Sequence, residues 1–219
     1  MASEPKAAPL AHHFDSYLQQ KESASLGMWL FLGQEIMFFG GLFLAYTIYR
    51  WRYASAFAAA SNDLDLRLGL LNTVVLIGSS LTIALAVRSA HLGKRKDLVG
   101  FLLATLALGG VFLGVKTIEY AQKFAHHLVP GPHFRFEGAD PTQAQMFFTL
   151  YFFMTGLHAL HMIVGMAILV WMLRPAAQGR WTPDNHNFVE GFGLYWHFVD
   201  IIWIFLFPLL YLIGRHHGA

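Results

Sequence analysis

The sequence of 219 residues contains no cysteine. This absence excludes disulfide bonds, covalently attached c-type haem and thiolate metal sites. Charged residues are also scarce, because Asp, Glu, Lys and Arg make up only 13% of the chain, about half the share usual in soluble domains. A formal net charge of +2 gives no reason to expect nucleic acid as a partner. The polar residues 1–25 lack the apolar core of a secretory signal peptide.

Apolar residues are abundant and account for 56% of the chain. They gather in five segments, each long enough to cross a bilayer, which takes about 20 residues per helix. The sequence therefore predicts an all-α integral membrane protein, a five-helix bundle forming one domain over residues 26–214. Polar tails are expected at residues 1–25 and 215–219. The predicted spans are 26–49, 66–89, 98–118, 144–173 and 189–214.

Five spans place the two termini on opposite sides of the membrane. The most basic short loop is 90–97, which contains Lys94, Arg95 and Lys96. Because Lys and Arg are enriched in cytoplasmic loops, we predict a cytoplasmic N-terminus and a periplasmic C-terminus. Localisation in the inner membrane of a bacterium follows from this interpretation.

Several predicted spans carry polar side chains near their centres. A charged residue at mid-membrane costs roughly 2.5–3.5 kcal/mol on insertion scales, so such groups should face protein, water or a lipid headgroup. In the last span the polar residues fall on one helical face, at separations of seven and three residues. We predict a polar layer in which these groups pair, share protons or hold lipid headgroups. Its members are Glu35, Ser79, His158, His161, Glu190, His197 and Asp200.

Glycines at helical spacing are expected to allow close helix approach. Gly33 and Gly40 share one side of the first span, and Glu35 points roughly to the opposite side. Gly110 and Gly114 give the third span a similar small-residue seam. We therefore predict that all four glycines are packing residues.

The polar layer leaves one redox alternative open. His158 or His161 together with His197 could ligate a b-type haem between two helices. A di-iron site would need Glu-x-x-His pairs, and this layer has none. Histidines in the N-terminal tail and in the loop 119–143 lack the ligand spacing of a metal site. We expect neither a catalytic residue nor a metal site in this chain.

Motifs along nearly the whole chain resemble subunit III of haem–copper oxidases, most closely bacterial cytochrome c oxidase subunit III. The matching motifs, in chain order, are His12-His13-Phe14-Asp15-Ser16; Leu26-Gly27-Met28-Trp29-Leu30-Phe31-Leu32 with Glu35 and Met37-Phe38-Phe39; Asn72-Thr73 with Ser79-Ser80-Leu81-Thr82; Phe112-Leu113-Gly114 with Glu119-Tyr120; Thr155-Gly156-Leu157-His158-Ala159-Leu160-His161 with Gly165; and Tyr195-Trp196-His197-Phe198-Val199-Asp200 with Trp203.

The resemblance implies a non-catalytic subunit of an aerobic respiratory complex that couples electron transfer to proton translocation. It implies packing on subunit I, a neighbouring subunit II, bound phospholipid, and support of proton uptake and complex stability. Haem and copper would reside in the partner subunits. Long members have seven helices, whereas this chain begins at the helix that carries the intramembrane Glu, here Glu35. The alternatives are the equivalent subunit of a quinol oxidase or nitric oxide reductase, or a haem b membrane anchor.

Overall fold

The computed structural model describes residue 12 and residues 14–183 and 185–216. Within these residues the regular structure is helical, apart from one isolated β-bridge between Thr182 and Asn185. Five of the described helices are long and apolar enough to cross a membrane, which confirms the predicted all-α membrane architecture. The elements are α1 (Tyr17–Arg52), α2 (Ala54–Asn62), α3 (Leu66–His91), α4 (Arg95–Ala125), α5 (Pro141–Ala177), α6 (Asn187–Tyr211) and the short 3-10 helix η1 (Ile213–His216).

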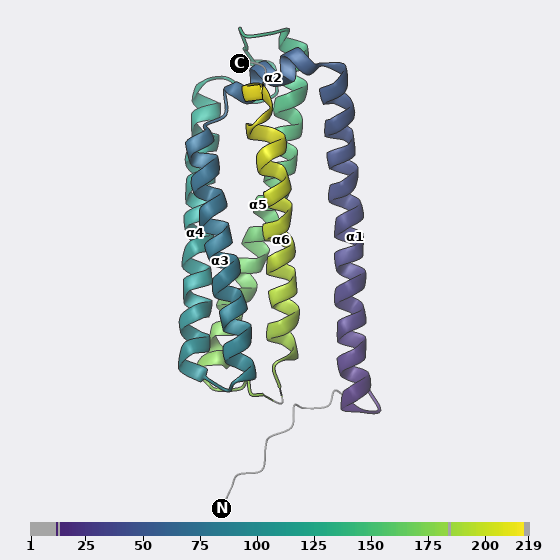
Figure 1. Ribbon diagram of the computed structural model, residues 1–219, viewed down its shortest axis with the longest axis vertical. Coiled ribbons are helices and arrows are strands. Elements are labelled where there is room, and N and C mark those ends of the chain that lie inside the picture. The colour runs from purple at the N-terminus through teal and green to yellow at the C-terminus, as the bar shows by residue number, and fades with distance from the viewer. Residues whose placement is uncertain (1–11, 13, 184, 217–219) are drawn as a thin grey trace, which may run out of the picture.

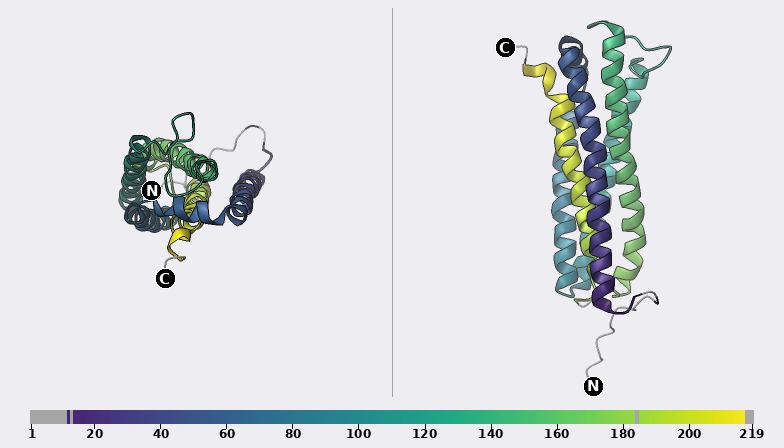
Figure 2. Two further views of the ribbon diagram at one scale, coloured as in Figure 1. Left: turned by 90° about the horizontal axis from the view of Figure 1, so that it is seen from above. Right: turned by 90° about the vertical axis from the view of Figure 1, so that its right-hand side faces the viewer.

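Helices α3, α4, α5 and α6 form a ring, and α1 lies outside it against α5 and α6 (Figures 1 and 2). The short α2 crosses one end of the bundle and joins α1 to α3 (Figure 1). In the most apolar 18-residue stretch of α6, 61% of the sequence is buried inside the protein, against 17–28% in the corresponding stretches of the other four spans. This difference identifies α6 as the central helix, since the remaining helices turn much of their apolar surface outward.

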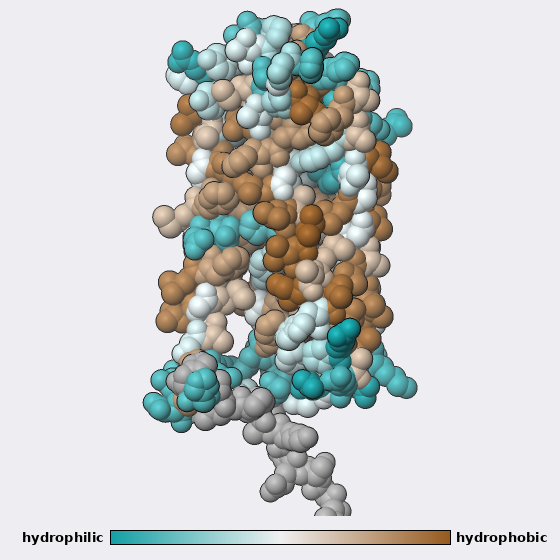
Figure 3. All heavy atoms as spheres, turned by 180° about the vertical axis from the view of Figure 1, so that it is seen from behind, coloured by the Kyte–Doolittle hydropathy of each residue, from teal (hydrophilic) through white to brown (hydrophobic). Residues whose placement is uncertain are grey.

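Apolar residues cover most of the middle of the molecule, apart from a hydrophilic patch at mid-height, and polar residues gather at its two ends (Figure 3). The described N-terminal and C-terminal residues lie at opposite ends of the long axis, as five spans require (Figure 1). This surface pattern is the one expected of a bundle whose middle faces acyl chains. The assignment of the N-terminal end to the cytoplasm stays a prediction.

Several helices extend beyond their predicted boundaries. Helix α1 begins at Tyr17, so residues 17–25 of the predicted polar tail are helical. Ser16 caps this helix, because its hydroxyl accepts a hydrogen bond from the backbone N–H of Gln19 at 3.2 Å. The predicted loop 50–65 contains α2, whose alanines favour helix and whose Phe57 is fully buried. Apolar runs mark the membrane-spanning part of a helix and not the polar turns that extend beyond it.

The prediction that Gly33, Gly40, Gly110 and Gly114 are packing residues is wrong for contacts within this chain. A Cβ atom added to Gly33, Gly40 or Gly114 would meet nothing within 4 Å, and one on Gly110 would meet only the tip of Met166 at 3.9 Å. Helix α1 turns its Glu35 face toward α5 and α6. The glycines on the opposite side are therefore left on the outer surface.

Other glycines make the close contacts inside the bundle. A Cβ atom on Gly165 would lie 2.9 Å from the indole ring of Trp196, and one on Gly193 would lie 2.9 Å from Val87. Gly69 similarly approaches the rings of Phe207 and Tyr211. Aromatic side chains of α6 leave no room for a side chain at Gly165 and Gly69, and Val87 of α3 leaves none at Gly193, which explains why glycine stands there.

Candidate functional site

Glu35 and His161 meet between α1 and α5. The Nε2 atom of His161 lies 3.3 Å from Oε2 of Glu35, within ion-pair range although the angles do not make a hydrogen bond. The Nδ1 atom of His161 lies 2.8 Å from the carbonyl oxygen of Leu157. A carbonyl can only accept, so Nδ1 carries a proton and Nε2 faces the carboxyl group. The contact is attractive only when a further proton lies on Glu35 or on Nε2, and the pair can therefore hold one exchangeable proton.

The second polar group lies between α3 and α6. Ser80 Oγ and His197 Nδ1 are 2.7 Å apart. Asp200, one turn after His197, is 3% exposed, and neither of its carboxylate oxygens has a hydrogen-bond partner among the described residues. These three residues line a groove of about 490 Å³. A buried carboxyl group in such a setting is costly unless it is neutral or meets a donor from outside the chain.

Two predicted members of the polar layer, Ser79 and His158, have surroundings that indicate a structural role. Ser79 accepts a hydrogen bond from the indole N–H of Trp196 at 3.1 Å. His158 is fully buried, with Phe112 and Trp203 each at a ring distance of 5.3 Å. A haem bound to His158 would have to displace these packed rings, so the geometry disfavours His158 as a haem ligand.

The structure places Glu190 away from the mid-membrane layer, so its predicted membership is wrong. Glu190 lies in the first turn of α6, about 15 Å along the helix from Asp200 at 1.5 Å per residue. Its Oε1 atom is 2.6 Å from Nε2 of His91 and 3.4 Å from Nε2 of His186. The seven-residue spacing between Glu190 and His197 indicates that they share one face of the helix. It does not indicate that they lie at the same depth in the membrane.

The remaining predicted residues form two groups and not one continuous layer. The Glu35–His161 pair lies between α1 and α5, and the Ser80–His197–Asp200 group lies between α3 and α6. No hydrogen bond among the described residues joins these two groups. The described side chains therefore offer no hydrogen-bonded route for a proton from one group to the other.

The prediction missed a buried ionic cluster near the other end of the bundle. Lys116 Nζ lies 3.1 Å from Oε2 of Glu119, and the hydroxyl groups of Tyr151 and Tyr211 donate to Oε1 of Glu119 at 2.7 and 2.5 Å. Lys116 is 3% exposed and Glu119 is fully buried. The i,i+3 spacing of the ion pair was visible in the sequence, but the predicted span ended at residue 118. Three helices, α4, α5 and α6, are joined through this one carboxylate.

A second groove, of about 680 Å³, opens between the N-terminal half of α1 and helices α5 and α6. Its walls are mainly apolar, and Lys21 contributes a cation near the end of the bundle. Figure 3 shows an opening between α1 and the rest of the molecule toward that end. The apolar lining residues include Met28, Phe31, Val164, Ile168 and Phe192.

Comparison with known proteins agrees with the motifs. A family model described as cytochrome c oxidase subunit III matches residues 11–215. Subunit 3 of the cytochrome bo(3) ubiquinol oxidase of Pseudomonas aeruginosa is 31% identical over 212 residues, covering 95% of this chain and 93% of that protein. Cytochrome c oxidase subunit 3 of Thermostichus vulcanus is 33% identical over 198 residues, 87% of each chain. A probable quinol oxidase subunit 3 of Staphylococcus epidermidis is 31% identical over 214 residues, 95% of this chain and 98% of that protein.

The matched region includes all five membrane-spanning helices and both polar groups described above. The protein is thus a multi-pass membrane protein and a subunit of an oxidase complex of respiratory electron transport. The chain belongs to the cytochrome c oxidase subunit III family.

Proposed function

We propose that the chain is the non-catalytic subunit III of a cytochrome c oxidase in the inner membrane of an aerobic bacterium. In this proposal it packs on subunit I, shares the complex with subunit II, and supports proton uptake and complex stability. The observation that carries the proposal is the pair formed by the buried Glu35, near the middle of α1, and the half-buried His161 of α5, which can hold one proton next to the outer face of the bundle. Haem and copper would reside in the partner subunits.

Quinol is the second candidate electron donor, because relatives named as quinol oxidase subunit 3 match this chain about as well as those named for cytochrome c. Purification of the intact complex and identification of subunit II would distinguish the two donors. A subunit II with a cysteine-containing copper domain supports cytochrome c. A subunit II without copper ligands would assign the complex to quinol.

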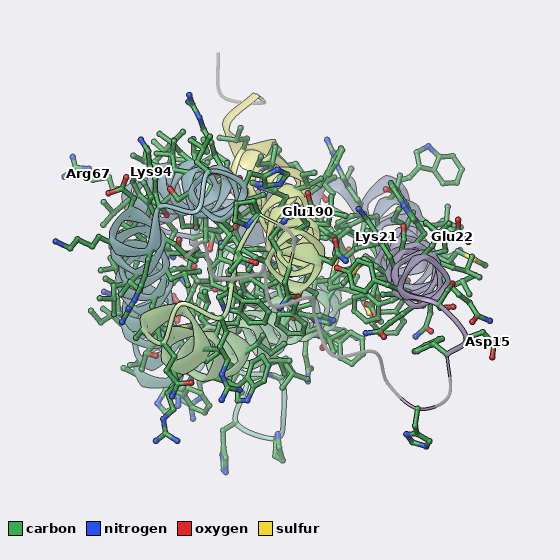
Figure 4. All side chains as sticks on the ribbon, turned by 90° about the horizontal axis from the view of Figure 1, so that it is seen from below. Asp15, Lys21, Glu22, Arg67, Lys94 and Glu190 are labelled. Carbon is green, nitrogen blue, oxygen red and sulfur yellow. The ribbon has the colours of Figure 1, made fainter. Side chains whose placement is uncertain are left out.

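Bound phospholipid fits the groove between α1 and helices α5 and α6. Its apolar walls suit acyl chains, and Lys21 lies on the side of α1 that faces α6, where a phosphate group would meet it, whereas Glu22 lies on the side away from α6 (Figure 4). A lipid there would fill the space between α1 and the four-helix ring. It would thereby hold α1, with Glu35, in position against α5.

Substitution of Glu35 tests the proton role. Glu35→Gln retains the shape and most hydrogen bonding, so we expect assembly and electron transfer to remain largely intact. Both Glu35→Gln and Glu35→Ala remove the proton-holding group, so we expect a normal first turnover and a several-fold decline in oxygen consumption over repeated turnovers in both variants. Time courses of oxygen uptake by the purified complex measure both effects, with Glu22→Gln, on the far side of α1, as the control. Loss of activity at the first turnover in Glu35→Gln, with intact metal centres, would show an essential role and overturn the supporting one.

The outer face of α1 supplies a surface for subunit I. Gly33 and Gly40 lie one above the other there and are open to a close helix contact. We therefore expect Gly40→Leu to reduce co-purification of subunit I several-fold, measured by the subunit ratio after affinity purification. Gly27→Leu places the same side chain on another side of α1, also free of contacts in this chain, and should leave the ratio unchanged. Equal ratios for the two variants would place subunit I elsewhere.

A further inference from the structure

Three side chains of the kinds that bind metal ions converge where α3 ends and α6 begins. His91, His186 and Glu190 each offer one ligand atom, and these atoms all lie within 4.8 Å of one another. Figure 4 looks onto this end of the bundle and shows Glu190 on α6. The side chain of Glu190 is 37% exposed and that of His91 is 45% exposed, so a metal ion from solution can reach both.

Rigid local structure fixes the backbone at all three positions. His91 is the last residue of α3, and the helix stops there because Gly93 adopts a positive φ of 65° while Lys94 N–H bonds to the carbonyl of Ser89 at 2.9 Å. His186 is the N-cap residue of α6. Glu190 follows one turn later, with its N–H bonded to the carbonyl of His186 at 3.1 Å. The site is therefore assembled by two helix ends and not by a long loop.

The tautomer of His186 favours a cation at this position. Its Nδ1 atom lies 3.3 Å from the carbonyl oxygen of Thr182. Because that oxygen can only accept, Nδ1 carries the proton and the lone pair of Nε2 points toward Glu190. Nε2 and the carboxylate oxygen are then two acceptors facing each other at 3.4 Å. A cation between them turns this unfavourable contact into an attractive one.

We propose that His91, His186 and Glu190 bind one divalent metal ion of the zinc class. Two imidazole nitrogens and one carboxylate oxygen are a common ligand set for zinc, with water in the fourth position. Tetrahedral bonds of about 2.0–2.1 Å place ligand atoms about 3.3 Å apart. The His186–Glu190 distance of 3.4 Å already fits this spacing. The His91–Glu190 distance of 2.6 Å has to open by less than 1 Å, which the exposed ring of His91 allows.

Two protons are poorer occupants of the site than one metal ion. Imidazole rings of His91 and His186 have centroids only 4.1 Å apart. Two imidazolium groups at that distance would repel each other. One metal ion instead uses both rings as neutral ligands, while the carboxylate offsets half of its double charge. The pair of histidines is thus better suited to a shared divalent cation than to two separate protons.

Zinc titration of the purified complex tests the site. After removal of loosely bound metal with a chelator, zinc is added in competition with a chromophoric indicator. We expect a site with a dissociation constant below about 10 µM that is weakened at least tenfold by Glu190→Gln and by His186→Gln. His126→Gln and His133→Gln, in the loop at the other end of the molecule, should not change it. Any other result, including binding unchanged in the two site variants, overturns the proposal.

Two measurements on the unmodified complex keep the test valid if the site variants fail to assemble. Zinc should protect His91 and His186, but not His126, from diethyl pyrocarbonate, as read by mass spectrometry of the chain. Cobalt should give the intense visible absorption of tetrahedral coordination, and zinc should displace it. Modification of His91 and His186 at an unchanged rate in saturating zinc would exclude the site.

Discussion

Lys116→Met is expected to destabilise the bundle by about 3–5 kcal/mol, the usual cost of leaving one partner of a buried ion pair unpaired. The residue lies 3.1 Å from a fully buried carboxylate, and its ammonium group is also surrounded by aromatic rings, with Trp203 at 5.0 Å. Without Lys116, Glu119 would keep only two tyrosine hydroxyl groups and the weaker, more distant charge of Lys123. Thermal denaturation of the purified complex, followed by loss of this subunit, measures the effect.

The double variant Lys116→Met/Glu119→Gln separates charge from packing. It removes both charges while keeping a polar group that can bond to Tyr151 and Tyr211, so most of the lost stability should return. Lys96→Met, at an exposed position, should change stability little. If the double variant is as unstable as the sum of its single variants, the ion pair is not what the cluster contributes, and the aromatic packing around Lys116 holds the helices together.

Gly165→Leu is expected to cost about 3 kcal/mol, at the upper end of the range for overpacked cores. A Cβ atom there would lie 2.9 Å from Trp196 and 3.1 Å from Tyr195, before any further side-chain atoms are added. Trp196 cannot move aside easily, because it is fully buried and its indole N–H is bonded to Ser79 at 3.1 Å. We therefore expect α5 and α6 to separate, with a large fall in the yield of folded protein.

Gly100→Leu is the matched control for this substitution. Gly100 lies on the outer side of α4, where an added Cβ atom meets nothing within 4 Å. The same leucine should be accepted there with normal yield and an unchanged denaturation temperature. Comparable losses in the two variants would mean that leucine disturbs insertion into the membrane and not the contact with Trp196.

The sequence by itself determined the membrane architecture. Each apolar segment is long enough to span the bilayer, and α-helix is the structure in which such a segment satisfies its own backbone hydrogen bonds in lipid. It also predicted that Glu35 and Asp200 stand near the middle of their helices, as they do in the structure, because position along a span follows from the sequence. Glu190 was included in the layer because it shares a helical face with His197, although it stands at the start of the predicted span 189–214 and in the first turn of α6.

Only the tertiary structure decided which polar groups meet and which helix faces turn inward. Periodicity divides a helix into faces, but the rotation of each helix about its axis is set by all of its neighbours together. The pairing of Glu35 with His161 and the outward position of Gly33 both follow from the rotation of α1. The burial of Lys116 depends likewise on tyrosines from α5 and α6. Contacts between distant segments fix these arrangements, and a pattern read along one segment carries no information about them.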